Sequence, residues 1–101
     1  MEDRYSVKLM DHALRDLDCI YGYIAGKLME PETASEQIDA LEAGILSLES
    51  MPCRCPRRQT GAYVGKGYRQ LFVNNYTVIF RVDEANKAVL ILTIRYSASQ
   101  F

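Results

Sequence analysis

Apolar side chains occupy every second position along residues 76–82, and this alternation constrains the fold more than any other feature of the chain. The apolar positions are Tyr76, Val78, Phe80 and Val82. A period of two predicts a half-buried β-strand. Asn74 and Asn75 precede it and suit a two-residue turn, because asparagine tolerates positive φ. Residues 68–73 and 76–82 are therefore predicted to form a β-hairpin.

Two more segments are predicted to be strands. "AVLILTIRY", residues 88–96, is an almost continuous apolar run, as expected for a strand in the interior of a sheet. "YSVKL", residues 5–9, alternates and predicts a short first strand.

Residues 11–28 and 31–48 instead repeat apolar side chains at spacings of three and four, which predicts two amphipathic helices. Asp11 is the predicted N-cap of the first, and Pro31 fits the first turn of the second. Cys19 lies beside the apolar stripe and is expected to be buried. The short connection predicts an antiparallel helical hairpin.

The predicted order is β-α-α-β-β-β, and the predicted fold class is α+β. In this fold an N-terminal strand and the helical hairpin pack on a mostly antiparallel sheet. The length of 101 residues predicts one domain, residues 1–101.

Charge is divided unevenly between the two halves of the chain. Residues 1–50 hold 11 acids and 4 bases, a balance of −7, and residues 51–101 hold 2 acids and 8 bases, a balance of +6. No acidic residue occurs from Met51 to Val82. Such asymmetry indicates an interaction surface. The pI near 5.8 argues against a protein that binds nucleic acid over its whole surface, but it allows one basic face.

Several classes of protein and of site do not fit the sequence. No apolar run is long enough to span a membrane, and acids occupy the start of the chain, where a secretory signal needs bases. The protein is therefore expected in the cytoplasm. "CRC", with Cys53 and Cys55, lacks the further ligands of a zinc site, so neither a metal nor a cofactor is predicted. His12, the only histidine, is expected to lie at the surface or cap a helix.

Three segments in this order resemble the RelE/ParE toxins of bacterial type II toxin–antitoxin systems. They are "DHALRDLDCIYGYI", "PETASEQIDALEAGILSLESMP" and "GYRQLFVNNYTVIFRVDEANKAVLILTIRY". The resemblance covers nearly the whole chain. It implies a small toxin that inhibits growth and is neutralised by a cognate antitoxin in a hetero-oligomer. It also leaves two activities open, because one fold serves both. RelE-like members cleave mRNA on the ribosome, whereas ParE-like members inhibit DNA gyrase.

The resemblance implies catalytic positions only if the chain is RelE-like. Those residues are Arg69, Arg81, Arg95 and Tyr96. Cleavage by 2′-hydroxyl attack needs a proton acceptor, cations on the phosphate and an acid for the leaving oxygen. Two positions depart from that pattern. The second base of the first hairpin strand falls on Leu71 or Phe72, and the arginine of the next strand falls on Thr77. Because other residues occupy two of the expected basic positions, the sequence favours the gyrase-inhibiting branch.

Three of these residues also have an ordinary structural interpretation. A strand arginine such as Arg81 is often solvated or ion-paired, and Tyr96 fits the edge of the core. Arg69 shares its parity with core residues, so it would leave the sheet at a bulge or pair with an acid of the helices. Five bases around the loop of residues 52–67 are candidates for binding a partner: Arg54, Arg57, Arg58, Lys66 and Arg69. A toxin fold that has lost its activity and only binds an antitoxin is the second alternative, after the endoribonuclease.

Overall fold

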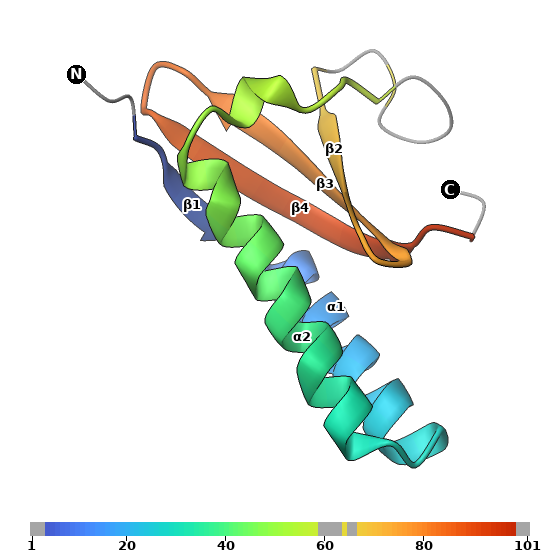
Figure 1. Ribbon diagram of the computed structural model, residues 1–101. Coiled ribbons are helices and arrows are strands. Elements are labelled where there is room, and N and C mark those ends of the chain that lie inside the picture. Colours follow the sequence, from blue (N-terminus) through green and yellow to red (C-terminus); the bar gives the residue numbers. More distant parts are fainter. Residues whose placement is uncertain (1–3, 59–63, 65–66, 99–101) are drawn as a thin grey trace.

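A computed structural model of the chain describes residues 4–58, residue 64 and residues 67–98 (Figure 1). The main elements are β1 (Ser6–Leu9), α1 (Asp11–Gly22), α2 (Pro31–Leu46), β2 (Arg69–Val73), β3 (Tyr76–Asp83) and β4 (Ala88–Tyr96). This is the predicted order, and the α+β class is confirmed. None of the described helices is long and apolar enough to cross a membrane.

The four strands form one sheet in the order β1-β4-β3-β2. Strand β4 pairs antiparallel with β3 and parallel with β1, so the apolar run lies in the interior, as predicted. Strands β2 and β3 form the predicted hairpin, and Asn74 adopts φ 53° in its turn. The sheet is therefore mostly antiparallel, with one parallel edge.

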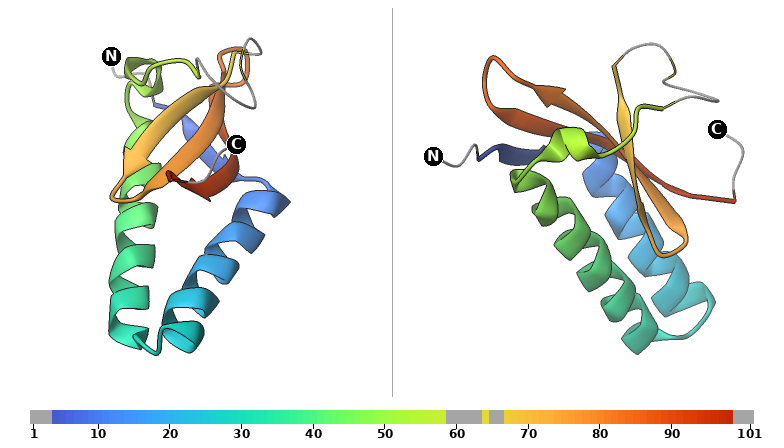
Figure 2. Two further views of the ribbon diagram at one scale, coloured as in Figure 1. Left: turned by 90° about the vertical axis from the view of Figure 1, so that its right-hand side faces the viewer. Right: turned by 45° about the horizontal axis from the view of Figure 1, so that its top comes forward.

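The hydrophobic core lies between the sheet and the helical hairpin. Its fully buried members include Leu41, Ile45, Leu48, Val78, Phe80, Val89 and Ile91. Both helices lie on one side of the sheet, and the end of the hairpin that joins them extends past the sheet (Figures 1 and 2). The molecule is consequently elongated, with extents of 44 × 31 × 21 Å.

The prediction that β3 is half-buried was wrong for its first half. On the face away from the helices, Thr77 and Ile79 are 1% and 0% exposed. The hydroxyls of Thr77 and Ser97 lie 2.8 Å apart, and the Ser97 N–H bonds to the Asn75 carbonyl at 2.7 Å, so the chain directly after β4 stays beside β3. Only from Arg81 onward does the outward side chain reach solvent.

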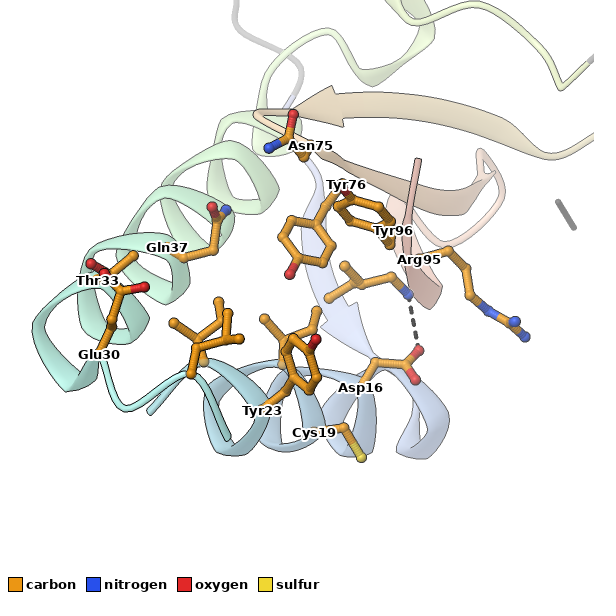
Figure 3. A pocket seen from close by; sticks show the side chains of 14 residues that line it. Asp16, Cys19, Tyr23, Glu30, Thr33, Gln37, Asn75, Tyr76, Arg95 and Tyr96 are labelled. Carbon is orange, nitrogen blue, oxygen red and sulfur yellow. Dashed lines mark hydrogen bonds between the residues drawn. The ribbon is translucent and has the colours of Figure 1, made fainter. Parts of the chain in front are cut away.

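Two predictions about α1 were also wrong. Asp11 is the first helical residue, not the N-cap, because the Met10 N–H still bonds to the Ile91 carbonyl at 2.9 Å and holds Met10 in an extended conformation. Cys19 is exposed, because its side chain points away from the other side chains of α1 that face the sheet (Figure 3).

Residues 56–58 cover the outer edge of β2. The Arg58 N–H bonds to the Tyr68 carbonyl at 2.8 Å, and the Gln70 N–H bonds to the Pro56 carbonyl at 3.1 Å. This pairing protects an edge that would otherwise expose unpaired backbone groups.

A polar cluster ties β1 to the turn between β3 and β4. The Tyr5 hydroxyl donates to Glu84 Oε1 at 2.7 Å, and the Cys53 thiol approaches Glu84 Oε2 at 3.4 Å. The hydrogen bond from Tyr5 lowers the pKa of Glu84, and the same bond raises the pKa of Tyr5. Burial raises the pKa of the neighbouring Cys55 thiol.

At Gly44, α2 lies close against β2, whereas Gly22 faces open space, so alanine substitutions at the two positions should have opposite effects. A Cβ at Gly44 would lie 2.7 Å from Val73 Cγ2, whereas a Cβ at Gly22 would meet nothing within 4 Å. Gly22→Ala should raise the free energy of unfolding by roughly 0.5–1 kcal/mol. Gly44→Ala should lower it by about 1 kcal/mol, because overpacking outweighs the gain in helix propensity. Urea denaturation of both variants measures the difference, and equal stabilisation would contradict the packing.

The Glu84 carboxylate predicts loss of stability in acid. Because its pKa is lowered in the folded protein, its contribution is complete above the ordinary value of 4.5 and disappears as pH falls through the folded pKa. Tyr5→Phe removes the main cause of this shift. The difference in unfolding free energy between the wild type and Tyr5→Phe should therefore be present at pH 7 and shrink towards pH 3. Denaturation at both pH values measures it, and a difference that does not change with pH would contradict the assignment.

Candidate functional site

The outer face of the sheet carries two of the predicted arginines, at opposite ends. Arg81 is exposed and lies opposite Leu90, whereas Arg95 lies opposite Thr77. Thr77 and Arg81 are four residues apart on β3, so the two arginine positions are separated by roughly 13 Å along the strand. Arg95 Nε donates to Thr93 Oγ1 at 3.2 Å.

Arg69 lies on the other face of the sheet from Arg81. It is paired opposite Phe80, a fully buried residue of the core side. Its Nη1 donates to the carbonyl oxygens of Cys55 and Cys53 at 2.7 and 3.3 Å. Arg69 thus neither leaves the sheet at a bulge nor pairs with an acid of the helices. It holds the segment before β2 in place.

The remaining basic candidates differ in their contacts. Arg54 donates to the Ser50 and Met51 carbonyls, at 2.7 and 3.1 Å, and so stabilises the chain beyond the end of α2. Arg58 Nη1 donates to Gln70 Oε1 at 2.9 Å. Arg57 is exposed. Lys66 lies outside the described residues.

Two tyrosines meet at the end of the sheet. Tyr76 and Tyr96 are paired across β3 and β4, and their rings form an edge-to-face contact with centroids 5.7 Å apart. Tyr96 is 49% exposed. Burial raises the pKa of Tyr76, with a smaller contribution from the neighbouring tyrosine hydroxyls. The Tyr76 phenol is therefore neutral at physiological pH, and it can donate a hydrogen bond.

Asp16 attaches α1 to the part of β4 that extends past β1. Its Oδ2 accepts hydrogen bonds from Thr93 Oγ1 at 2.6 Å and from the Ile94 N–H at 3.0 Å. His12 Nδ1 lies 3.0 Å from the same oxygen, and His12 is exposed, as expected. The carboxylate takes the place of a neighbouring strand, because β1 pairs with β4 only as far as Ile91.

Beside this contact, a cleft of about 760 Å³ opens between the helical hairpin and the end of the sheet (Figure 3). Its apolar lining includes Ile20, Ile24, Leu28 and Ile94. Its polar lining includes Asp16, Gln37 and Tyr76, whereas Arg95 lies at one side with its guanidinium directed away from the other labelled side chains. The cleft is therefore mainly apolar, with a few polar groups, as is common in binding sites.

This arrangement is better suited to binding than to phosphate chemistry. The three candidate arginines do not converge on one point, and in the part of the chain that the structure describes no three acidic, cysteine or histidine side chains gather to hold a metal. Asp16 and Gln37 were not predicted from the sequence as residues of a site. Both interrupt an apolar stripe, since Asp16 lies three residues after Ala13 and Gln37 three residues after Ala34. A polar residue at a core position was the available clue.

Solved structures place the chain in a class of small α+β toxins. A chain of the chromosomal ParDE toxin–antitoxin system from P. aeruginosa is 26% identical, with a TM-score of 0.77 over 93% of this chain and 97% of that one. The toxin–antitoxin complex RelBE2 from Mycobacterium tuberculosis shares the fold at 19% identity, with a TM-score of 0.63 over 92% and 98%. The archaeal RelE–RelB complex from Pyrococcus horikoshii shares it at 17%, with a TM-score of 0.57 over 94% and 97%.

The family described as the ParE toxin of the type II toxin–antitoxin system parDE matches residues 7–101. The chain therefore belongs to this family, and it is a ParE-like toxin of a type II toxin–antitoxin system. The resemblance to RelE/ParE toxins is thereby confirmed, on the ParE side. No curated protein sequence matches the chain.

The contacts of Asp16 predict a large loss of stability when its carboxylate is removed. Asp16→Ala leaves the Ile94 N–H and the Thr93 hydroxyl without their acceptor, and hydrogen bonds to a charged group contribute about 1.5–3 kcal/mol each. The free energy of unfolding should fall by about 3 kcal/mol. Asp18→Ala, an exposed acid of the same helix, should change it by less than about 0.5 kcal/mol. Urea denaturation compares the two, and equal effects would contradict a role for Asp16 in holding α1.

Proposed function

We propose that this toxin arrests bacterial growth by binding DNA gyrase, and that a cognate antitoxin neutralises it. One observation carries the choice of target. Arg69 is held by backbone carbonyls on the helix side of the sheet, and Arg81 and Arg95 lie at opposite ends of the other side. RNA cleavage requires several charges around one phosphate, and their separation supports a binding activity instead.

A binding activity also agrees with the distribution of charge. The outer face of the sheet carries Arg81 and Arg95, and Arg58 reaches it through Gln70. Positive charges dispersed over a face attract a partner and orient it, and each contributes little by itself.

The antitoxin is proposed from the relatives. The RelBE2 and archaeal RelE–RelB structures are described as toxin–antitoxin complexes, and the family is named for the parDE pair. Large apolar side chains remain exposed on the described surface: Leu14, Tyr21, Tyr23, Leu28, Met29, Leu46, Met51, Phe72 and Tyr96 among them. Exposed apolar area of this kind is typical of a protein that functions in a complex.

The alternative activity, ribosome-dependent cleavage of mRNA, would use Arg95 with Tyr96. The two residues are adjacent at the end of β4, and Arg81 would have to act from about 13 Å away. This hypothesis therefore depends on a single cation near the tyrosine pair.

Induction of the toxin without its antitoxin should stop growth and activate the response to DNA damage. The reason is that gyrase trapped on DNA leaves strand breaks. The mRNA, by contrast, should stay intact. Growth curves, a reporter of DNA damage and mapping of mRNA ends measure this. Cuts in mRNA at ribosomal A sites would instead identify an endoribonuclease. Unchanged growth at high expression would leave only the inactive, antitoxin-binding protein.

Variants of the two outer arginines provide the control. If the toxin binds gyrase, Arg95→Ala and Arg81→Ala should each cost roughly 1 kcal/mol of affinity, so that toxicity is reduced about fivefold. If Arg95 stabilises charge on a phosphate, Arg95→Ala alone should reduce the rate about a hundredfold, and Arg81→Ala should not. Titration of gyrase supercoiling by each purified variant measures the effect.

A further inference from the structure

Phe72 is a large apolar side chain on the outer face of the sheet, the face on which Arg95 lies. It is 60% exposed, and it is paired opposite Thr77, which in turn lies opposite Arg95. The three residues therefore form one row across β2, β3 and β4. The alternation along β2 agrees with this placement, because Leu71 and Val73 pack against the core on the other side of the sheet.

The position of Phe72 distinguishes it from the other exposed apolar side chains. Within the described strands, the one other large apolar side chain with comparable exposure is Tyr96, which lies on the helix side and lines the cleft. A single exposed apolar residue is ordinary in itself, so its meaning depends on its neighbours.

Those neighbours place a cation on two sides of Phe72. Arg95 lies two strands away in the same row, so its Cα atom is roughly 10 Å from that of Phe72. Gln70 lies two residues away on β2, on the same face, and its Oε1 accepts a hydrogen bond from Arg58 Nη1 at 2.9 Å. An apolar ring between two guanidinium groups is complementary to an apolar recess that has carboxylates at its border.

A surface of dispersed arginines needs a second source of affinity. Exposed charges at the rim of an interface mainly accelerate and orient association. Most of the binding energy of a protein–protein interface comes instead from a few large side chains that become fully desolvated. A phenylalanine ring buries a large apolar area in such a contact. On the outer face, Phe72 is the residue suited to that role.

We propose that Phe72 is the apolar anchor of the surface that binds the target, and that its ring enters an apolar recess of gyrase bordered by carboxylates. This inference rests on the proposed function, because the occupant of the surface is gyrase. The net charge of −1 and the acidic helical hairpin disfavour the phosphate backbone of DNA as the occupant. Arg58 and Arg95 orient the encounter, and the ring supplies most of the affinity.

The anchor is tested with Phe72→Thr, which removes the ring and keeps a β-branched side chain suited to a strand. The probe is purified gyrase without DNA, and surface plasmon resonance measures its affinity for the toxin. The affinity should fall at least about thirtyfold, as for a residue at the centre of an interface. Because Phe72 is largely exposed, the variant should keep the fold, which circular dichroism checks.

Leu46→Ala is the matched control, because Leu46 is 57% exposed but belongs to α2, on the other side of the sheet. It should change the affinity for gyrase less than about threefold. Equal effects of Leu46→Ala and Phe72→Thr, or a loss below about threefold for Phe72→Thr, would overturn the proposal.

Phe72→Leu separates an apolar recess from a flat stacking surface. Leucine fills a recess nearly as well as phenylalanine, but it has no ring on which a DNA base stacks. The affinity should therefore fall less than about fivefold. A loss as large as that of Phe72→Thr would overturn the apolar recess, and binding that also requires DNA would identify a base as the partner of the ring.

Salt separates the contribution of the ring from that of the arginines. Raising KCl from about 50 to about 300 mM should shrink the effect of Arg95→Ala and leave that of Phe72→Thr unchanged, because salt screens charges. An effect of Phe72→Thr that shrinks in parallel would overturn its role as an apolar anchor. Failure of the wild-type toxin to bind gyrase under any condition would instead contradict the proposed function, so the two failures are distinguishable.

Discussion

The pairing of β4 with its neighbours is the interaction on which the rest of the molecule depends. Strand β4 pairs with β3 along one side. Along the other side it pairs with β1, but only as far as Ile91. Beyond that residue the free edge is completed by Asp16, whose carboxylate accepts from the Ile94 N–H. A side chain thus replaces a strand, and it fixes the position of α1 relative to the sheet.

The cleft opens beside this contact, and Asp16, which holds α1 to β4, is one of its lining residues. On the other side, Gly44 lets α2 approach Val73 closely. The hairpin is therefore attached to the sheet at one end, and its other end extends past the sheet, where Tyr23 and Leu28 remain exposed (Figure 2). Apolar surface in that position stabilises a complex more than it stabilises the monomer.

The uneven charge of the chain becomes a separation in space. The helical hairpin carries the excess of acids, and the sheet with the segment before β2 carries the bases. Two surfaces of opposite sign suit two partners of different chemistry. In the function proposed for this toxin, the basic face of the sheet contacts the target.

The sequence by itself determined the order of elements, the hairpin turn at Asn74 and the interior position of β4, because each depends on local periodicity or on the backbone preference of one residue. The sequence also places most of the acids in the first half of the chain and most of the bases in the second. The tertiary structure alone decided which faces the arginines occupy. From the alternation along β2, Arg69 was predicted to share a face with core residues. Only the fold, however, brings the carbonyls of Cys53 and Cys55 to its guanidinium. The burial of Thr77 and the bonds of Asp16 to β4 likewise join residues distant in the chain, and no local pattern encodes such contacts.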